Sequence, residues 1–83
     1  MAPRSEPQPA LGQAIRQLRK ERNLSQEELG HRSEIHPTWI SHIESGRANP
    51  AWGTVRRIAA VLELPLSEIV LLTERLAEDE EAG

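Results

Sequence analysis

The fold of this chain is decided by two neighbouring segments, Leu24-Ser25-Gln26-Glu27-Glu28-Leu29 and Ile40-Ser41-His42-Ile43-Glu44-Ser45-Gly46. Ser25 and Glu28 match a capping box, the sequence pattern that starts a helix. Pro37 is favoured in the first turn of a second helix, and the glycine that closes the second segment commonly ends one. The two segments therefore predict two short helices joined by a tight turn.

Outside this pair, apolar residues recur at helical spacing in three further segments, at about 11–22, 52–62 and 66–76. No segment alternates with a period of two over any length, so strands are not expected. The predicted fold class is all-α, a compact five-helix bundle in which the second and third helices form a helix-turn-helix.

The two ends of the chain differ in composition from its middle. Residues 1–10 are proline-rich and are predicted to form a disordered N-terminal arm. Residues 11–76 are predicted to form the helix-turn-helix domain, and residues 77–83 an acidic C-terminal tail.

Composition argues against several classes of protein. The 83 residues suffice for one small domain, and the absence of cysteine excludes disulfides and thiolate metal sites. Neither a secretory signal nor an apolar run of about 18 residues is present, so we expect a cytoplasmic protein without a membrane segment. The three histidines lack the spacing of metal ligands, and no nucleophile has an evident base. We therefore expect no metal, no cofactor, no small-molecule ligand and no enzymatic activity.

The formal net charge of −3 hides an uneven distribution. Residues 11–62 carry eight basic and five acidic side chains, whereas residues 78–81 are all acidic. A mildly basic body behind an acidic end permits binding to nucleic acid without requiring it.

The helix that begins near Pro37 has a polar face that its core does not need. With a rotation of about 100° per residue and Ile40 pointing inward, four short polar side chains fall on the opposite side of the helix. Short side chains without acids allow a helix to approach the edges of DNA bases closely. The alternative is that they are ordinary solvated surface residues. They are Thr38, Ser41, His42 and Ser45.

The neighbouring residues favour the first interpretation. Gln26 lies in the first turn of the preceding helix, where free backbone N–H groups attract anions. Arg47 and Asn49 follow the polar helix and are expected to reach the next phosphates. Arg19 and Glu44 have the same angular offset from the core on their helices, which predicts a partly buried ion pair, although spacing alone also allows both to be exposed.

The chain resembles the lambda-repressor/Cro-type helix-turn-helix family over residues 11–69. The motifs that carry the resemblance are the two opening segments, Asn49-Pro50 and Arg57-Ile58-Ala59. The resemblance implies a five-helix bundle that binds double-stranded DNA, and a buried ion pair between Arg19 and Glu44. The base-contacting positions that it implies are Pro37, Thr38, Ser41 and His42. The phosphate-contacting positions that it implies are Gln26, Ser45, Arg47 and Asn49.

The chain departs from the family pattern at two turns and on the polar face. Glu34 and Glu63 stand where the family commonly has glycine, and a glutamate with positive φ costs about 1 kcal/mol unless the turn is built differently. No arginine, glutamine or asparagine lies on the polar face, so the strongest bidentate base contacts are missing. We expect modest specificity in each half-site.

The last helix and the two tryptophans complete the expectations. Val70 and Leu71 point away from the core stripe of their helix, which suggests a homodimer interface, although packing on the first helix or the arm is the alternative. Trp39 is expected to pack against the core, the alternative being that it covers the sugar-phosphate edge of DNA. Trp52 is expected to pack at the start of the fourth helix. The leading hypothesis is a homodimeric, sequence-specific transcriptional regulator on a near-palindromic operator. The alternative is a protein-interaction module or antitoxin-type partner.

Overall fold

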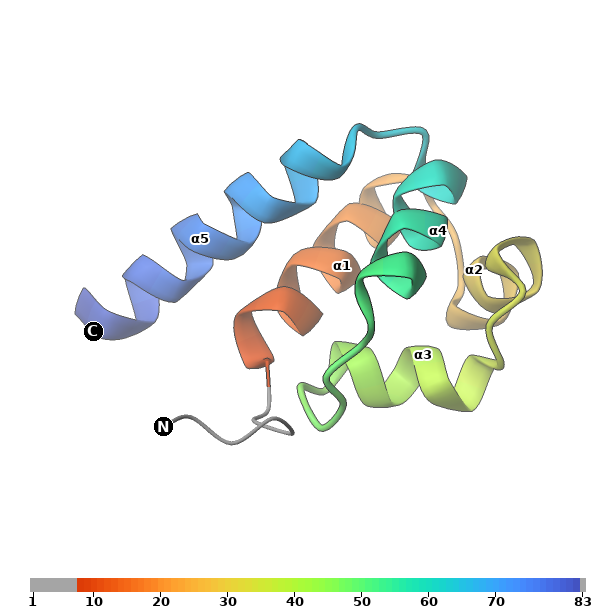
Figure 1. The fold of residues 1–83 in the computed structure, drawn as a ribbon, viewed down its shortest axis with the longest axis horizontal. Helices are drawn as coiled ribbons and strands as arrows, with labels where there is room; N and C mark the ends of the chain where they lie inside the picture. The colour runs from red at the N-terminus through yellow and green to blue at the C-terminus, as the bar shows by residue number, and fades with distance from the viewer. Residues whose placement is uncertain (1–7, 83) are drawn as a thin grey trace.

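A computed structural model describes residues 8–82, which fold into five helices. Helices α1 and α5 lie side by side and run in opposite directions, α4 packs on α2 and α5, and α3 runs along one edge of the molecule (Figure 1). The described part of the chain contains no strand, as the sequence predicts. The helices are α1 (Pro9–Glu21), α2 (Gln26–Ser33), α3 (Pro37–Glu44), α4 (Trp52–Leu62) and α5 (Leu66–Ala82).

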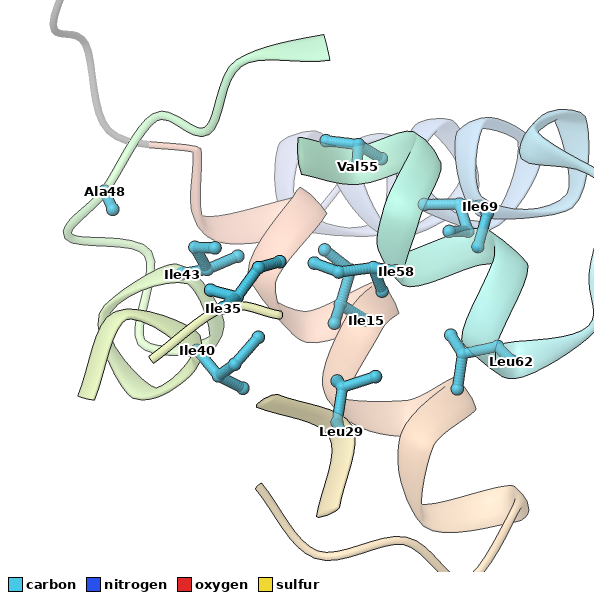
Figure 2. Close-up of a cluster of buried hydrophobic side chains, with 11 residues drawn as sticks. Ile15, Leu29, Ile35, Ile40, Ile43, Ala48, Val55, Ile58, Leu62 and Ile69 are labelled. Atoms are coloured by element: carbon cyan, nitrogen blue, oxygen red, sulfur yellow. The ribbon is translucent and has the colours of Figure 1, made fainter. Parts of the chain in front are cut away.

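One hydrophobic core joins all five helices. Each helix contributes at least one fully buried aliphatic side chain, and Figure 2 shows these side chains converging between α1, α3 and α4. Because the inward side of α3 is held by this core, its outward side is left to solvent. The fully buried side chains are Ile15, Leu29, Ile40, Ile43, Ile58, Leu62 and Ile69.

The helix-turn-helix begins at a complete capping box. The Ser25 hydroxyl accepts a hydrogen bond from the Glu28 backbone N–H at 3.0 Å, and the Glu28 carboxylate accepts one from the Ser25 N–H at 3.0 Å. The hydrogen bond from the Ser25 backbone N–H to the carboxylate favours its charged form and lowers the pKa of Glu28 below its ordinary value of 4.5. At α3, the His36 ring nitrogen Nδ1 accepts from the Thr38 N–H at 3.1 Å, so both helices start with a side-chain cap.

The two glutamates at the turns adopt the conformation that glycine usually supplies. Glu34 has φ 60° and Glu63 has φ 57°, both in the left-handed region. The following amides close the turns, with Ile35 N–H donating to the Gly30 carbonyl at 2.9 Å and Leu64 N–H to the Ala59 carbonyl at 3.1 Å. The turns therefore keep the usual helix-ending geometry, and the glutamates carry the strain.

Two element boundaries differ from expectation. Helix α1 begins at Pro9 within the predicted arm, while residues 1–7 lie outside the described residues. Helix α5 was expected to end near residue 76 but continues to Ala82, so the predicted acidic tail is helical as far as residue 82. Alanine and glutamate are good helix formers, and no glycine or proline interrupts the segment. Within residues 8–82, no helix is long and apolar enough to cross a membrane.

Candidate nucleic-acid interface

The N-terminal ends of α2 and α3 border an open groove of about 550 Å³. Backbone N–H groups in the first turn of a helix have no partner within the helix and favour anions. The groove thus joins an anion-attracting helix end to the polar side of α3. Its lining residues are Arg19, Ser25, Gln26, Glu27, Pro37, Thr38 and Ser41.

A buried ion pair lies behind this groove. Arg19 Nε donates to Glu44 Oε2 at 2.7 Å and Arg19 Nη2 to Glu44 Oε1 at 2.9 Å, with side-chain exposures of 9% and 2%. Arg19 Nη1 also donates to the Leu24 carbonyl at 2.7 Å. Such a bidentate pair has fixed geometry, so it locks α1 to the end of α3 and to the segment before α2.

The ion pair also orients Gln26. The Gln26 side-chain amide donates from Nε2 to Glu44 Oε1 at 3.0 Å. An amide nitrogen carries two hydrogens, so this bond leaves the second hydrogen able to donate toward the groove. The same contact holds α2 to α3 directly.

The outer face of α3 consists of Thr38, Ser41, His42 and Ser45. Thr38, Ser41 and Ser45 are exposed and His42 is half-buried. The Ser45 hydroxyl donates to the His42 carbonyl at 3.1 Å, which leaves its oxygen as an acceptor. The face carries no acidic side chain, so no negative charge on it opposes an approaching phosphate backbone.

Trp39 does not pack in the core, and that prediction is wrong. Its side chain is 44% exposed and stacks on the His42 ring, with ring centroids 6.2 Å apart and planes inclined by 29°. The reason is geometric, because the aliphatic side chains of Ile40 and Ile43 already fill the inward side of α3. Trp52 is also exposed, at 59%.

The loop after α3 is held against the start of α1. Gly46 has φ 81°, and a Cβ there would lie 2.9 Å from Pro9 Cα. The Arg47 N–H donates to the His42 carbonyl at 3.0 Å, which fixes the backbone while the Arg47 side chain is exposed. Asn49 is exposed two residues further along the same loop.

Gly12 is a positioning residue that the sequence reasoning missed. A Cβ at Gly12 would lie 2.3 Å from the Ile43 carbonyl oxygen and 2.7 Å from that of Glu44. Only glycine therefore allows α1 to approach the end of α3 this closely. The available signal was a glycine inside a helical pattern, which costs about 1 kcal/mol relative to alanine and so calls for a packing reason.

A second, more apolar groove of about 250 Å³ lies between α5, the start of α4 and the loop before it. Val70 lines it, whereas Leu71 is 54% exposed on the adjoining surface of α5. Trp52 and Pro50 form part of the opposite wall. Within residues 8–82, no group of three or more histidine and acidic side chains is arranged to hold a metal ion.

Residues 10–72 match the family model of the helix-turn-helix domain. The immunity repressor protein of Bacillus phage phi105 is 35% identical over 72 residues, 87% of this chain and 49% of that protein, so the chain spans about half of its length. Control protein C.BamHI of Bacillus amyloliquefaciens is 33% identical over 64 residues, 76% of this chain and 79% of that protein. The structure of the master regulator for biofilm formation SinR in complex with DNA has a TM-score of 0.69 and 30% identity, covering 72% of this chain and 97% of that chain. This chain therefore belongs to the helix-turn-helix family, in the lambda-repressor/Cro-type group that its motifs resemble.

Proposed function

We propose that this protein is a transcriptional regulator that binds specific double-stranded DNA in the cytoplasm as a homodimer, without enzymatic activity. The observation that carries the proposal is the outer face of α3 beside a groove that Gln26 lines, where the Gln26 amide donates to Glu44 of the buried ion pair. A helix-turn-helix binds DNA with its first helix at the phosphates and its second in the major groove. The phage repressor and the control protein among the relatives, and SinR in complex with DNA, support this function.

Each site residue has a role that fits its chemistry. Thr38, Ser41 and His42 offer donors, acceptors and a methyl group to base edges, and Pro37 offers apolar contact. The phosphate contacts are assigned to residues at the start of α2, at the C-terminal end of the outer face and in the loop after α3. They are Gln26, Ser45, Arg47 and Asn49.

The homodimer is proposed to form through α5. Leu71 is exposed and Val70 lines the adjoining apolar groove. In a symmetric dimer, both copies bury this same surface against each other. Two copies of α3 would then meet successive major grooves about 34 Å apart, on a near-palindromic site.

The proposal is tested by selecting bound sequences from a random duplex pool and titrating the best site at several salt concentrations. Affinity should fall steeply with salt, because each neutralised phosphate releases counterions. The double variant Gln26→Ala, Arg47→Ala should weaken binding to all sequences alike and flatten the salt dependence, whereas Thr38→Ala should change base preference.

The matched control is Arg16→Ala, which removes an exposed arginine from α1 on a surface away from the groove. It should bind the selected site almost as the parent protein does. No enrichment of any sequence, together with no binding to duplex at low salt, would contradict the proposal.

One observation favours a second candidate. Trp52 and Leu71 present apolar surface that suits a protein partner as well as a second copy of this chain. A protein-interaction module or antitoxin-type partner that does not read DNA would bind no duplex, so the same titration distinguishes the two functions.

A further inference from the structure

The Trp39–His42 stack lies on the side of α3 that faces away from the groove. Relative to Ile40, the helical rotation places Ser41 and Thr38 at about 100° and 160°, and His42 and Trp39 at about 200° and 260°. The first two line the groove beside α2, whereas neither aromatic ring does. The exposed part of α3 therefore has a polar side next to α2 and an aromatic side beyond it.

This aromatic side leaves apolar surface of Trp39 open to solvent. The Trp39 side chain is 44% exposed. Its ring stacks on the His42 ring, with 6.2 Å between the ring centroids. Stacking restricts both rings and holds them as one broad surface at the edge of α3, which itself lies at the edge of the molecule (Figure 1). A held, flat surface loses little conformational entropy when it is covered.

The major groove of DNA offers one apolar group at its base edges, the C5-methyl of thymine. In the proposed complex, the start of α2 lies at one phosphate backbone. The aromatic side of α3, which faces away from α2, then points toward the opposite side of the DNA major groove. No residue of α3 lines the apolar groove beside α5. The proposed dimer interface therefore leaves Trp39 uncovered.

We propose that the stacked rings of Trp39 and His42 form an apolar contact surface for a thymine C5-methyl group, which makes Trp39 a specificity-determining residue. This inference rests on the proposed function. It adds a contact that the polar residues of α3 do not supply, and it compensates for the missing long bidentate side chains.

The test replaces each thymine of the selected site singly by deoxyuridine, which lacks only the methyl group. Burying one methyl changes affinity about fourfold. The parent protein should therefore bind at least one substituted site about fourfold more weakly, and Trp39→Ala should bind the thymine and deoxyuridine forms of that site equally. Arg16→Ala is the matched control, because this exposed α1 side chain does not line the groove and the variant should keep the sensitivity at that position.

A fluorescence measurement keeps structural and binding roles apart. In a Trp52→Phe background, Trp39 is the only tryptophan, so its emission should shift when the selected duplex is added. Circular dichroism should show that Trp39→Ala retains the helical content, as expected for an exposed position that receives a good helix former. Because Trp39 and His42 act as one surface, the effects of Trp39→Ala and His42→Ala should be less than additive.

The outcomes separate the two proposals. If the selected duplex binds but Trp39→Ala keeps the full deoxyuridine sensitivity, or if Trp39 emission does not change, the inference is overturned and the proposed function stands. If the parent protein binds no duplex, the proposed function fails and this inference fails with it.

Discussion

At the residue scale, the most consequential interaction is the buried network of Arg19, Glu44 and Gln26. The Glu44 carboxylate receives hydrogen bonds from both partners, and its side chain is 2% exposed. Burying two charges is costly, so such a pair contributes little net stability compared with apolar residues of similar size. Its value here lies in the direction that it gives to the Gln26 amide.

Glu44→Ala should lower the free energy of unfolding by about 3–5 kcal/mol, because Arg19 would remain buried without its carboxylate. Urea denaturation followed by circular dichroism measures this loss. The variant should also lose affinity for every duplex, since Gln26 loses its hydrogen-bond acceptor. A change below about 1 kcal/mol would mean that the pair is solvated, as most surface pairs are.

The double variant Arg19→Met, Glu44→Met separates folding from binding. Replacing both charges removes the unpaired ion, so most of the lost stability should return. Binding to DNA should stay weak, because the Gln26 amide is no longer oriented. Recovery of full DNA affinity together with stability would show that Gln26 does not depend on Glu44.

A second residue-scale prediction concerns Glu63, which has φ 57° at the end of α4. Glu63→Gly should raise the free energy of unfolding by about 0.5–1 kcal/mol, because glycine adopts the left-handed conformation without the Cβ clash. Thermal or urea denaturation measures the gain. Glu63→Ala is the control, since it removes the charge but keeps the Cβ, and an equal gain in that variant would assign the effect to charge.

At the scale of elements, the position of α3 depends on how closely α1 can approach it. The contact occurs where Gly12 meets the Ile43 and Glu44 carbonyl groups. These carbonyls belong to backbone and cannot move aside as a flexible side chain can. A shift of α1 against α3 would also disturb the Arg19–Glu44 pair, which joins the same two helices.

Gly12→Ala should therefore destabilise the protein by about 1–2 kcal/mol. Alanine gains about 1 kcal/mol in helix propensity, but forcing a methyl group into a packed contact costs up to about 3 kcal/mol. DNA affinity should fall as well, because the end of α3 is displaced. The measurements are urea denaturation and titration of the selected duplex.

Gly53 provides the matched control, because a Cβ there would meet nothing within 4 Å. Gly53→Ala should leave stability unchanged or raise it by up to about 1 kcal/mol. If both alanine variants were equally stable, the close approach of α1 and α3 would not constrain the fold.

At the scale of the whole molecule, the surface of α5 determines whether two copies can assemble. Leu71→Glu places a charge on the exposed apolar surface and should convert a dimer to a monomer with its helical content unchanged. Sedimentation velocity gives the mass, and DNA titration should show weaker binding to the near-palindromic site. Gln13→Glu adds the same charge to the exposed side of α1 and should stay dimeric. A dimer that persists in Leu71→Glu would exclude this interface.

Much of the architecture was predictable because it depends on local signals. Capping at Ser25, proline at the start of α3 and apolar spacing along each helix are properties of short segments, and the helices form where these signals lie. The acidic end of α5 was misjudged because two local signals disagreed. Its charge indicated a tail, whereas its helix propensity favoured continuation of the helix. The DNA contacts and the homodimer stay predictions.

The sequence by itself determined the five helices and the turn between α2 and α3, because apolar periodicity and helix caps are properties of short segments. It also offered the pairing of Arg19 with Glu44, which angular spacing left open and the family resemblance implied. Only the tertiary structure decided that Gln26 joins that pair, that Gly12 allows α1 to approach α3, and that Trp39 lies outside the core. These features depend on distances between helices that are remote in sequence. Such distances are set by how the whole core packs, and no single segment encodes them.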